Sequence, residues 1–150
     1  MNNIRITKHF DFETAHALYG YDGKCKNIHG HSYQLYVTVI GKPIDDAKHV
    51  KNGMVIDFGD LKLIVKSEIV DVFDHATVLN KNSPHAELAE KIRPHSPKVI
   101  LVGYQPTSEL MIIDFADRIS KRLPKSVTLH SLKLYETQNS YAEWFASDQE

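Results

Sequence analysis

Apolar and polar side chains alternate at the start of the chain. Over residues 4–15 the large apolar side chains fall on even positions: Ile4, Ile6, Phe10 and Phe12. A period of two is that of a strand with one buried face. Residues 32–41 are rich in β-branched and aromatic side chains, which favours a second strand. We expect these two strands to pair antiparallel, the simplest arrangement for neighbours in the chain.

Two later segments have the spacing of amphipathic helices. After Asp57, which is suited to an N-cap, apolar residues follow at intervals of three and four up to about Phe73, so the pattern predicts a helix. We expect Phe58, next to this cap, to anchor the helix in the core. The second helix begins after Thr107, also a suitable N-cap, and is ended by Pro124. Its expected buried side chains are Ile112, Phe115, Ala116, Ile119 and Leu123.

Period-two alternation returns near the C-terminus. Residues 127–136 and 141–145 predict two further strands, and the apolar run 98–103 predicts a short one. Residues 74–80 show no clear periodicity. Residues 81–105 form a long connector that is mostly polar, with the pattern of one helical turn over residues 85–93.

The predicted elements describe one α+β domain over residues 1–150. The expected architecture is an antiparallel β-sheet with two helices packed on one face. A chain of 150 residues with 42% hydrophobic and 25% charged residues is ordinary for a soluble domain with its own core.

The net charge and the number of cysteines bear on the partners of the protein and on its cellular compartment. The formal net charge of −1 shows no excess of basic residues of the kind that binds the nucleic-acid backbone. The single cysteine excludes an internal disulfide and fits a reducing compartment. No apolar signal core or membrane-spanning stretch stands out, so we expect a cytoplasmic protein without nucleic-acid or membrane partners.

The chemistry concentrates at Cys25 and in the sequence His29-Gly30-His31. In an extended strand His29 and His31 leave the backbone on the same face, and Gly30 adds no side chain to crowd a bound ion. His16 lies at the end of the first predicted strand. Three imidazoles without a fourth protein ligand are typical of a catalytic zinc site with an open position. The alternative is that these are structural histidines, and ligand type alone leaves iron and nickel open.

Cys25 and Glu136 can each be interpreted in two ways. Cys25 is either a general base activated by nearby cationic charge or an inert thiol. Glu136 shares parity with Leu132 and Leu134, so it either continues a buried strand face, where a carboxylate needs donors, or lies beyond the core edge in solvent. The remaining histidines lack ligand spacing and are taken as surface or packing residues: His9, His49, His85, His95 and His130.

Six blocks in order resemble the 6-pyruvoyl-tetrahydropterin synthase and 6-carboxytetrahydropterin synthase family. They are Phe-x-x-x-His at 12–16, Cys-x-x-x-His-Gly-His at 25–31, Met-Val-Ile-Asp-Phe at 54–58, Asp-His at 74–75, Pro-Thr-Ser-Glu at 106–109 and Glu-Thr at 136–137. The three residues between Cys25 and His29 and the ending 136–143 are most similar to the bacterial 6-carboxytetrahydropterin synthases. The connector 81–105 is longer than is usual in the family.

The resemblance implies a fold, an assembly and an activity. The fold is the tunnelling fold, in which subunits join their sheets into a barrel, usually as trimers paired into hexamers with active sites at subunit interfaces. The activity is that of a zinc-dependent lyase of queuosine precursor biosynthesis. It would convert 7,8-dihydroneopterin triphosphate to 6-carboxy-5,6,7,8-tetrahydropterin, acetaldehyde and triphosphate.

The resemblance also implies roles for single residues. His16, His29 and His31 would hold Zn²⁺, and Cys25 with Asp74 and His75 would form a catalytic relay. Asp74 capping a turn beside a surface His75 is the alternative.

Substrate-binding residues are implied as well. Glu136 would grip the two-pronged donor edge of the pterin. Thr107 and Glu109 would line the pterin pocket or merely cap the helix. Lys24 and Lys26 would meet the triphosphate or remain solvated.

Two other functions stay open at this point. One is 6-pyruvoyl-tetrahydropterin synthase activity, which eliminates triphosphate but keeps every side-chain carbon. The other is a non-catalytic zinc- or pterin-binding module. Such a module would not need Cys25, Asp74, His75 and Glu136 together, which counts against it.

Overall fold

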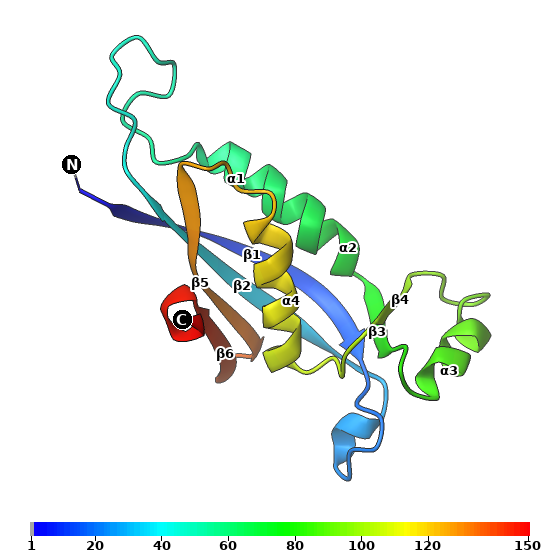
Figure 1. Ribbon diagram of the computed structural model, residues 1–150. Coiled ribbons are helices and arrows are strands. Elements are labelled where there is room, and N and C mark those ends of the chain that lie inside the picture. The colour runs from blue at the N-terminus through cyan, green and yellow to red at the C-terminus, as the bar shows by residue number, and fades with distance from the viewer. Residues whose placement is uncertain (1) are drawn as a thin grey trace.

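A six-stranded sheet in the order β4-β3-β1-β2-β5-β6 forms the body of the protein. The computed structural model describes residues 2–150 and is drawn in Figure 1. Its four longer strands pair antiparallel, as predicted: β1 (Ile4–His16), β2 (His29–Gly41), β5 (Val127–Thr137) and β6 (Ser140–Phe145).

The prediction of a purely antiparallel sheet is wrong, because two parallel strands extend it beyond β1. β3 (Ala76–Asn80) pairs parallel with β1, and β4 (Val99–Val102) pairs parallel with β3. The predicted strand at residues 98–103 is therefore confirmed, whereas β3 lies in the stretch without periodicity. Its pattern is absent because both faces are buried: Val78 packs into one core and Leu79 into another. Strands of this kind read as continuous apolar runs.

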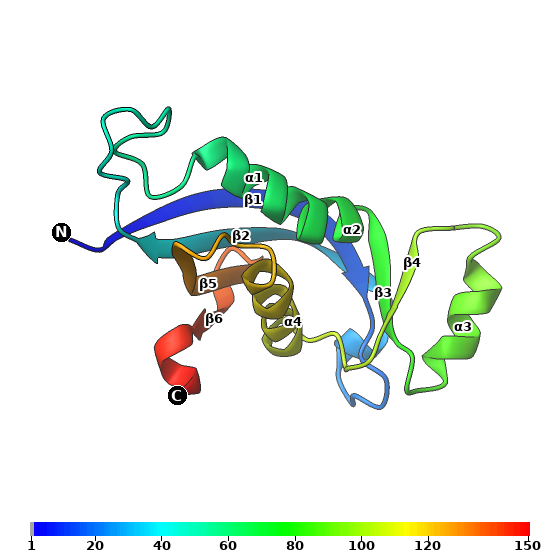
Figure 2. The same cartoon turned by 45° about the horizontal axis from the view of Figure 1, so that its top comes forward.

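Two helical units cover one face of the sheet (Figure 2). The first comprises α1 (Phe58–Val65), a π-helical turn (Lys66–Val70) and α2 (Asp71–Phe73), and the second is α4 (Ser108–Ser120). Their buried side chains meet the even positions of β1 and the odd positions of β2 in the main core. The two-helix prediction thus holds for this face.

A third helix covers part of the opposite face. α3 (His85–Ile92) connects β3 to β4 and buries Ala89 against Ala17, Leu79 and Val99 in a small second core. A parallel pair needs such a crossover. The long connector 81–105 therefore contains α3 and β4, which together with β3 form a β3–α3–β4 unit that widens the sheet.

Both predicted N-caps form, but Phe58 is not a core anchor. The Asp57 carboxylate accepts from the Gly59 N–H at 2.6 Å, and the Thr107 hydroxyl accepts from the Leu110 N–H at 3.2 Å. Phe58 is 52% exposed, because the first helical position turns its side chain to solvent and the buried stripe starts at Leu61. In residues 2–150 no helix is long and apolar enough to cross a bilayer.

The turn from α2 into β3 is fastened to β1 through the backbone of Glu13. The Asp74 carboxylate accepts from the Glu13 N–H at 2.8 Å, and the His75 N–H donates to the Glu13 carbonyl at 2.5 Å. His75 has a φ of 60°, a left-handed conformation that is strained for most residues other than glycine. The Glu13 hydrogen bond, followed by the nearby His75, holds the pKa of Asp74 below its ordinary value of 3.8.

The hydrogen bond between the Asp74 carboxylate and Glu13 should make the stability difference between the wild type and an Asp74→Asn variant depend on pH. Because the folded-state pKa of Asp74 is lowered, the carboxylate stabilises the fold above its unfolded pKa, and the effect is lost as pH falls through the folded pKa. We expect Asp74→Asn to lower the melting temperature at pH 7. Once the pH falls below the folded-state pKa of Asp74, the variant should melt at the same temperature as the wild type. Thermal unfolding at several pH values measures this, and a difference that did not change with pH would contradict it.

Candidate metal centre and active site

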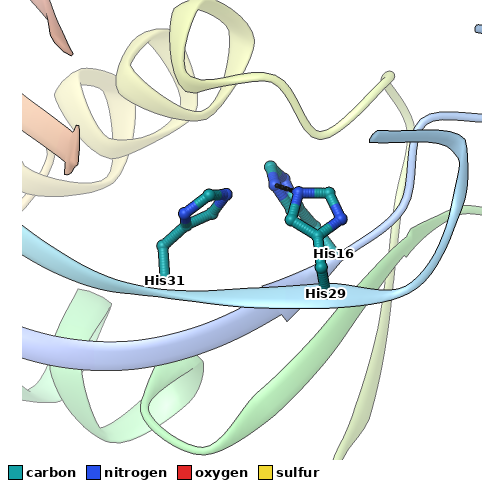
Figure 3. Close-up of side chains that lie close together, drawn as sticks. All are labelled: His16, His29 and His31. Carbon is teal, nitrogen blue, oxygen red and sulfur yellow. Dashed lines mark hydrogen bonds between the residues drawn. The ribbon is translucent and has the colours of Figure 1, made fainter. Parts of the chain in front are cut away.

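The strand register brings three imidazoles to one point. His16 is the last residue of β1 and lies directly opposite His29, the first residue of β2. His31 follows two positions later on the same face. One ring nitrogen from each residue lies within 4.8 Å of a ring nitrogen of each of the other two. Figure 3 shows the rings gathered on the side of the sheet that faces α4.

Backbone carbonyls set the tautomers of two of these rings. Nδ1 of His16 lies 2.6 Å from the Pro106 carbonyl oxygen, and Nδ1 of His29 lies 2.7 Å from that of Asn27. A carbonyl only accepts, so both Nδ1 atoms carry the proton and both Nε2 atoms keep a free lone pair when the rings are neutral.

Those two Nε2 atoms are only 3.1 Å apart. Two lone pairs facing each other at this distance repel, and a cation shared between them removes the repulsion. Two nitrogens bound to one tetrahedral zinc ion are about 3.3 Å apart. The His16–His29 spacing therefore fits a common metal ion, with the Pro106 and Asn27 carbonyls as the outer partners that fix ring orientation.

His31 supplies the third nitrogen. Its Nε2 is buried and has no hydrogen-bond partner among the described residues, although Oε1 of Glu136 lies 3.3 Å away. Burial lowers the pKa of His31 and also that of His16, against the raising effect of the Glu136 charge. Neutral rings with available nitrogens are the state that binds a metal.

Glu136 lies beside the histidines, at the end of the buried face of β5. Leu132 and Leu134 are buried on that face, and the Ser108 hydroxyl donates to Oε2 of Glu136 at 2.7 Å. One carboxylate oxygen is thus held by α4 while the other faces the imidazoles.

Two neighbours of this site were not predicted. Ser108 lies in the motif that contains Thr107, but nothing in its spacing marks it as a partner of Glu136. Tyr33 is fully buried, with its hydroxyl 3.4 Å from Nδ1 of His16. Its parity with His29 and His31 was a usable signal. Burial raises the pKa of Tyr33, so its hydroxyl stays protonated.

Cys25 lies half-buried on a 3₁₀ turn (Lys24–Lys26) in the loop between β1 and β2. Its carbonyl accepts from the Leu18 N–H at 2.9 Å, which closes the loop. Lys24 and Lys26 flank it and are exposed. The same loop passes through Asn27 to His29, so the thiol and a candidate metal ligand share one short segment.

Asp74 and His75 lie at the edge of β1, where both contact the backbone of Glu13. Oδ1 of Asp74 is 3.1 Å from Nδ1 of His75, whose side chain is 76% exposed. His75 lines a 310 Å³ cavity together with Glu13, Ser32 and Thr77, and His31 also borders this cavity. The two residues therefore contact each other, but within one subunit they do not join Cys25.

The other predicted residues lie outside the cluster. The Thr107 hydroxyl is engaged in the helix cap, and Glu109 is exposed on the first turn of α4. In the described chain the remaining histidines contribute to no metal-ligand group: His9 pairs with Asp11, His85 with Tyr19 and His130 with Phe145, and His49 and His95 are exposed.

Residues 5–147 match the family model described as 6-pyruvoyl tetrahydropterin synthase. The chain belongs to this family. Within it, similar curated relatives include the 6-carboxy-5,6,7,8-tetrahydropterin synthase of Haemophilus influenzae, 37% identical over 94% of this chain and 98% of the relative. That of Aquifex aeolicus is 30% identical over 93% of this chain and 96% of the relative.

Solved structures of the family share the fold. The 6-pyruvoyl tetrahydropterin synthase of Caenorhabditis elegans superimposes with a TM-score of 0.68 at 22% identity, over 97% of each chain. An uncharacterised protein from Wolinella succinogenes gives a TM-score of 0.76 at 20% identity, over 97% of this chain and 99% of that one. The curled mixed sheet with its helices is therefore a fold of this family.

The geometry predicts how metal content depends on the cluster. Replacing His16, His29 or His31 by alanine is expected to lower zinc affinity more than about 100-fold, since losing even an outer partner of a ligand costs 10- to 100-fold. Metal analysis after dialysis against a competing chelator measures the affinity. His95→Ala, an exposed histidine, is the matched control. Wild-type zinc affinity in His29→Ala would place the metal elsewhere.

Proposed function

We propose that this protein is a zinc-dependent 6-carboxy-5,6,7,8-tetrahydropterin synthase. It would convert 7,8-dihydroneopterin triphosphate and water to 6-carboxytetrahydropterin, acetaldehyde and triphosphate, a step in making queuosine precursors. The observation that carries the proposal is the convergence of His16, His29 and His31 beside Glu136. It occurs in a chain with near-full-length similarity to proteins of that name.

The three imidazoles fit zinc better than a hard cation, because they offer neutral nitrogen and no carboxylate oxygen. A zinc ion bound there would polarise the side-chain oxygens of the substrate and make the neighbouring C–H bond more acidic. Tyr33 and the Pro106 carbonyl keep His16 in position for this role.

Glu136 is the proposed pterin-binding residue. A pterin presents its 2-amino group and N3–H as two parallel donors, and a carboxylate can accept both. The Ser108 hydroxyl holds Glu136 so that it faces the imidazoles. A pterin bound to Glu136 in this way would have its ring next to the three histidines and its substituent chain within reach of a metal ion held by them. Thr107 and Glu109, on the same turn as Ser108, remain predicted contributors to the pocket.

Cys25 is the proposed base. Its loop runs directly into His29, and the half-buried Cys25 is flanked by Lys24 and Lys26. The same lysines are the proposed contacts of the triphosphate. Removal of a proton by Cys25 next to the polarised oxygen would begin elimination.

We further propose that subunits assemble edge to edge. β3 pairs with β1 only at Thr14–His16, so the outer edge of β1 over residues 4–13 has no strand partner in the described subunit. β6 is the opposite edge. Two free edges on one curled sheet allow head-to-tail pairing that closes into a ring. In such a barrel, with trimers paired into hexamers, Asp74 and His75 at the edge of β1 would serve a neighbour's Cys25.

Product analysis tests the activity. Purified protein given 7,8-dihydroneopterin triphosphate is expected to release acetaldehyde and a carboxytetrahydropterin, identified by mass spectrometry. Cys25→Ala should reduce turnover at least about 100-fold, as general base catalysis contributes 10²- to 10⁴-fold, while zinc content stays unchanged. A product that keeps all its side-chain carbons would instead make this a 6-pyruvoyl-tetrahydropterin synthase. Turnover by Cys25→Ala would overturn its assignment as the base.

His75→Gly separates catalysis from folding. Glycine accepts the left-handed conformation at this position, so the variant should be more stable by up to about 1 kcal/mol while losing most of its turnover. Mixing His75→Gly with Cys25→Ala under conditions that exchange subunits should restore part of the activity, because some interfaces regain both groups. No recovery in exchanged mixtures would contradict an active site shared between subunits.

The cytoplasmic location, inferred from the single cysteine, remains a prediction. Fractionation of cells that express the native chain is the direct measurement.

A further inference from the structure

The β3–α3–β4 crossover packs against the loop that carries Cys25. This loop leaves β1 at His16 and returns to β2 at His29, and on one side it touches residues of the long segment 81–105. Three separate contacts connect the two segments, and none of them is part of the metal cluster.

The first contact is apolar. Ala17, the residue after His16, is completely buried against Leu79, Ala89 and Val99. All three partners belong to the crossover. This small core fixes the direction in which the chain leaves β1, immediately after a candidate metal ligand.

The second contact is between aromatic rings. The ring of Tyr19 meets that of His85, the first residue of α3, edge to face at 5.2 Å between centroids and an interplanar angle of 81°. Nδ1 of His85 is buried without a hydrogen-bond partner among residues 2–150. The imidazole is therefore held by packing against the loop.

The third contact is a hydrogen bond from the linker between β4 and α4. Nε2 of Gln105 donates to the Tyr19 carbonyl at 3.0 Å, and the next residue, Pro106, accepts from His16. One linker thus holds both the Cys25 loop and a candidate metal ligand. The linker itself is tied down, since the Tyr104 hydroxyl donates to Asp114 of α4 at 2.5 Å.

Inside the loop a backbone hydrogen bond passes these constraints to the thiol. The Leu18 N–H, between the two anchored residues Ala17 and Tyr19, donates to the Cys25 carbonyl at 2.9 Å. Holding residues 17–19 in place therefore holds the Cys25 turn.

We propose that the crossover and the β4–α4 linker that follows it form a positioning element for the Cys25 loop, with His85 and Gln105 as positioning residues that act through Tyr19. The consequence for turnover rests on the proposed function, whereas the consequence for the loop does not. The 81–105 segment thereby supplies a support that keeps the thiol at a fixed place relative to the three imidazoles.

Loop order is measured without activity. In His85→Ala, Tyr19→Ala and Gln105→Leu, hydrogen exchange at residues 17–28 and iodoacetamide alkylation of Cys25 should both accelerate about fivefold or more, as expected for the loss of local stabilising contacts. Because Cys25 is the only cysteine, alkylation reports on this turn alone. Tyr19→Phe keeps the ring and should behave as wild type, as should His95→Ala, an exposed histidine of the same segment.

Activity is the second measurement. In the same variants kcat should fall about 10- to 100-fold, with KM changed less than about threefold and zinc content unchanged, since a small displacement of a reacting group has this effect. If the wild type makes no product, the proposed function fails, and exchange and alkylation still decide the present proposal. It is overturned if His85→Ala and Tyr19→Ala match His95→Ala in both rates. It is also overturned if exchange accelerates equally in the β2–β5 ladder, which would mean general destabilisation.

Discussion

The pairing of His16 with His29 across the β1–β2 ladder is the constraint on which the site depends. In an antiparallel pair a slip of one residue moves every side chain of a strand to the other face. The buried even positions of β1 and odd positions of β2 make such a slip costly, because it would expose either Phe10 and Phe12 of β1 or Tyr33 and Leu35 of β2. The main core therefore sets the geometry of the imidazoles: the same register that buries the aromatic side chains places the ligands opposite each other at the strand ends.

Elements far apart in the sequence complete what the register begins. The β4–α4 linker sets the tautomer of His16 through the Pro106 carbonyl, and the first turn of α4 holds Glu136 through Ser108. The imidazoles and Glu136 lie together on one face of the sheet, whereas Asp74 and His75 lie at the edge of β1, against the backbone of Glu13. This separation is the physical reason for the proposal that the relay is completed by a neighbouring subunit.

Sequence patterns predicted the long, one-sided elements well. β1, β2, β5, the helix from Phe58 to Phe73 and α4 each bury one face, so their side chains show a period of two or of three and four. The sequence pattern did not predict β3, because this strand is buried on both faces and so lacks a period of two. Its parallel pairing with β1 depends on a crossover that no local pattern reveals. The prediction that Phe58 lies in the core was wrong for a different reason. An apolar residue beside an N-cap does not indicate which way the first helical turn faces.

The sequence by itself determined which residues are available for chemistry: a His-x-His pair on one strand face, a third imidazole at the end of another strand, one thiol, and a carboxylate in line with apolar neighbours. These follow from spacing, since side-chain direction repeats along a strand. Only the tertiary structure decided which groups meet. It brought Ser108 and Tyr33 to the site, placed Asp74 and His75 at the edge of β1, and packed α3 against the Cys25 loop. Contacts between distant segments depend on the order and curvature of the strands, and no local periodicity encodes either.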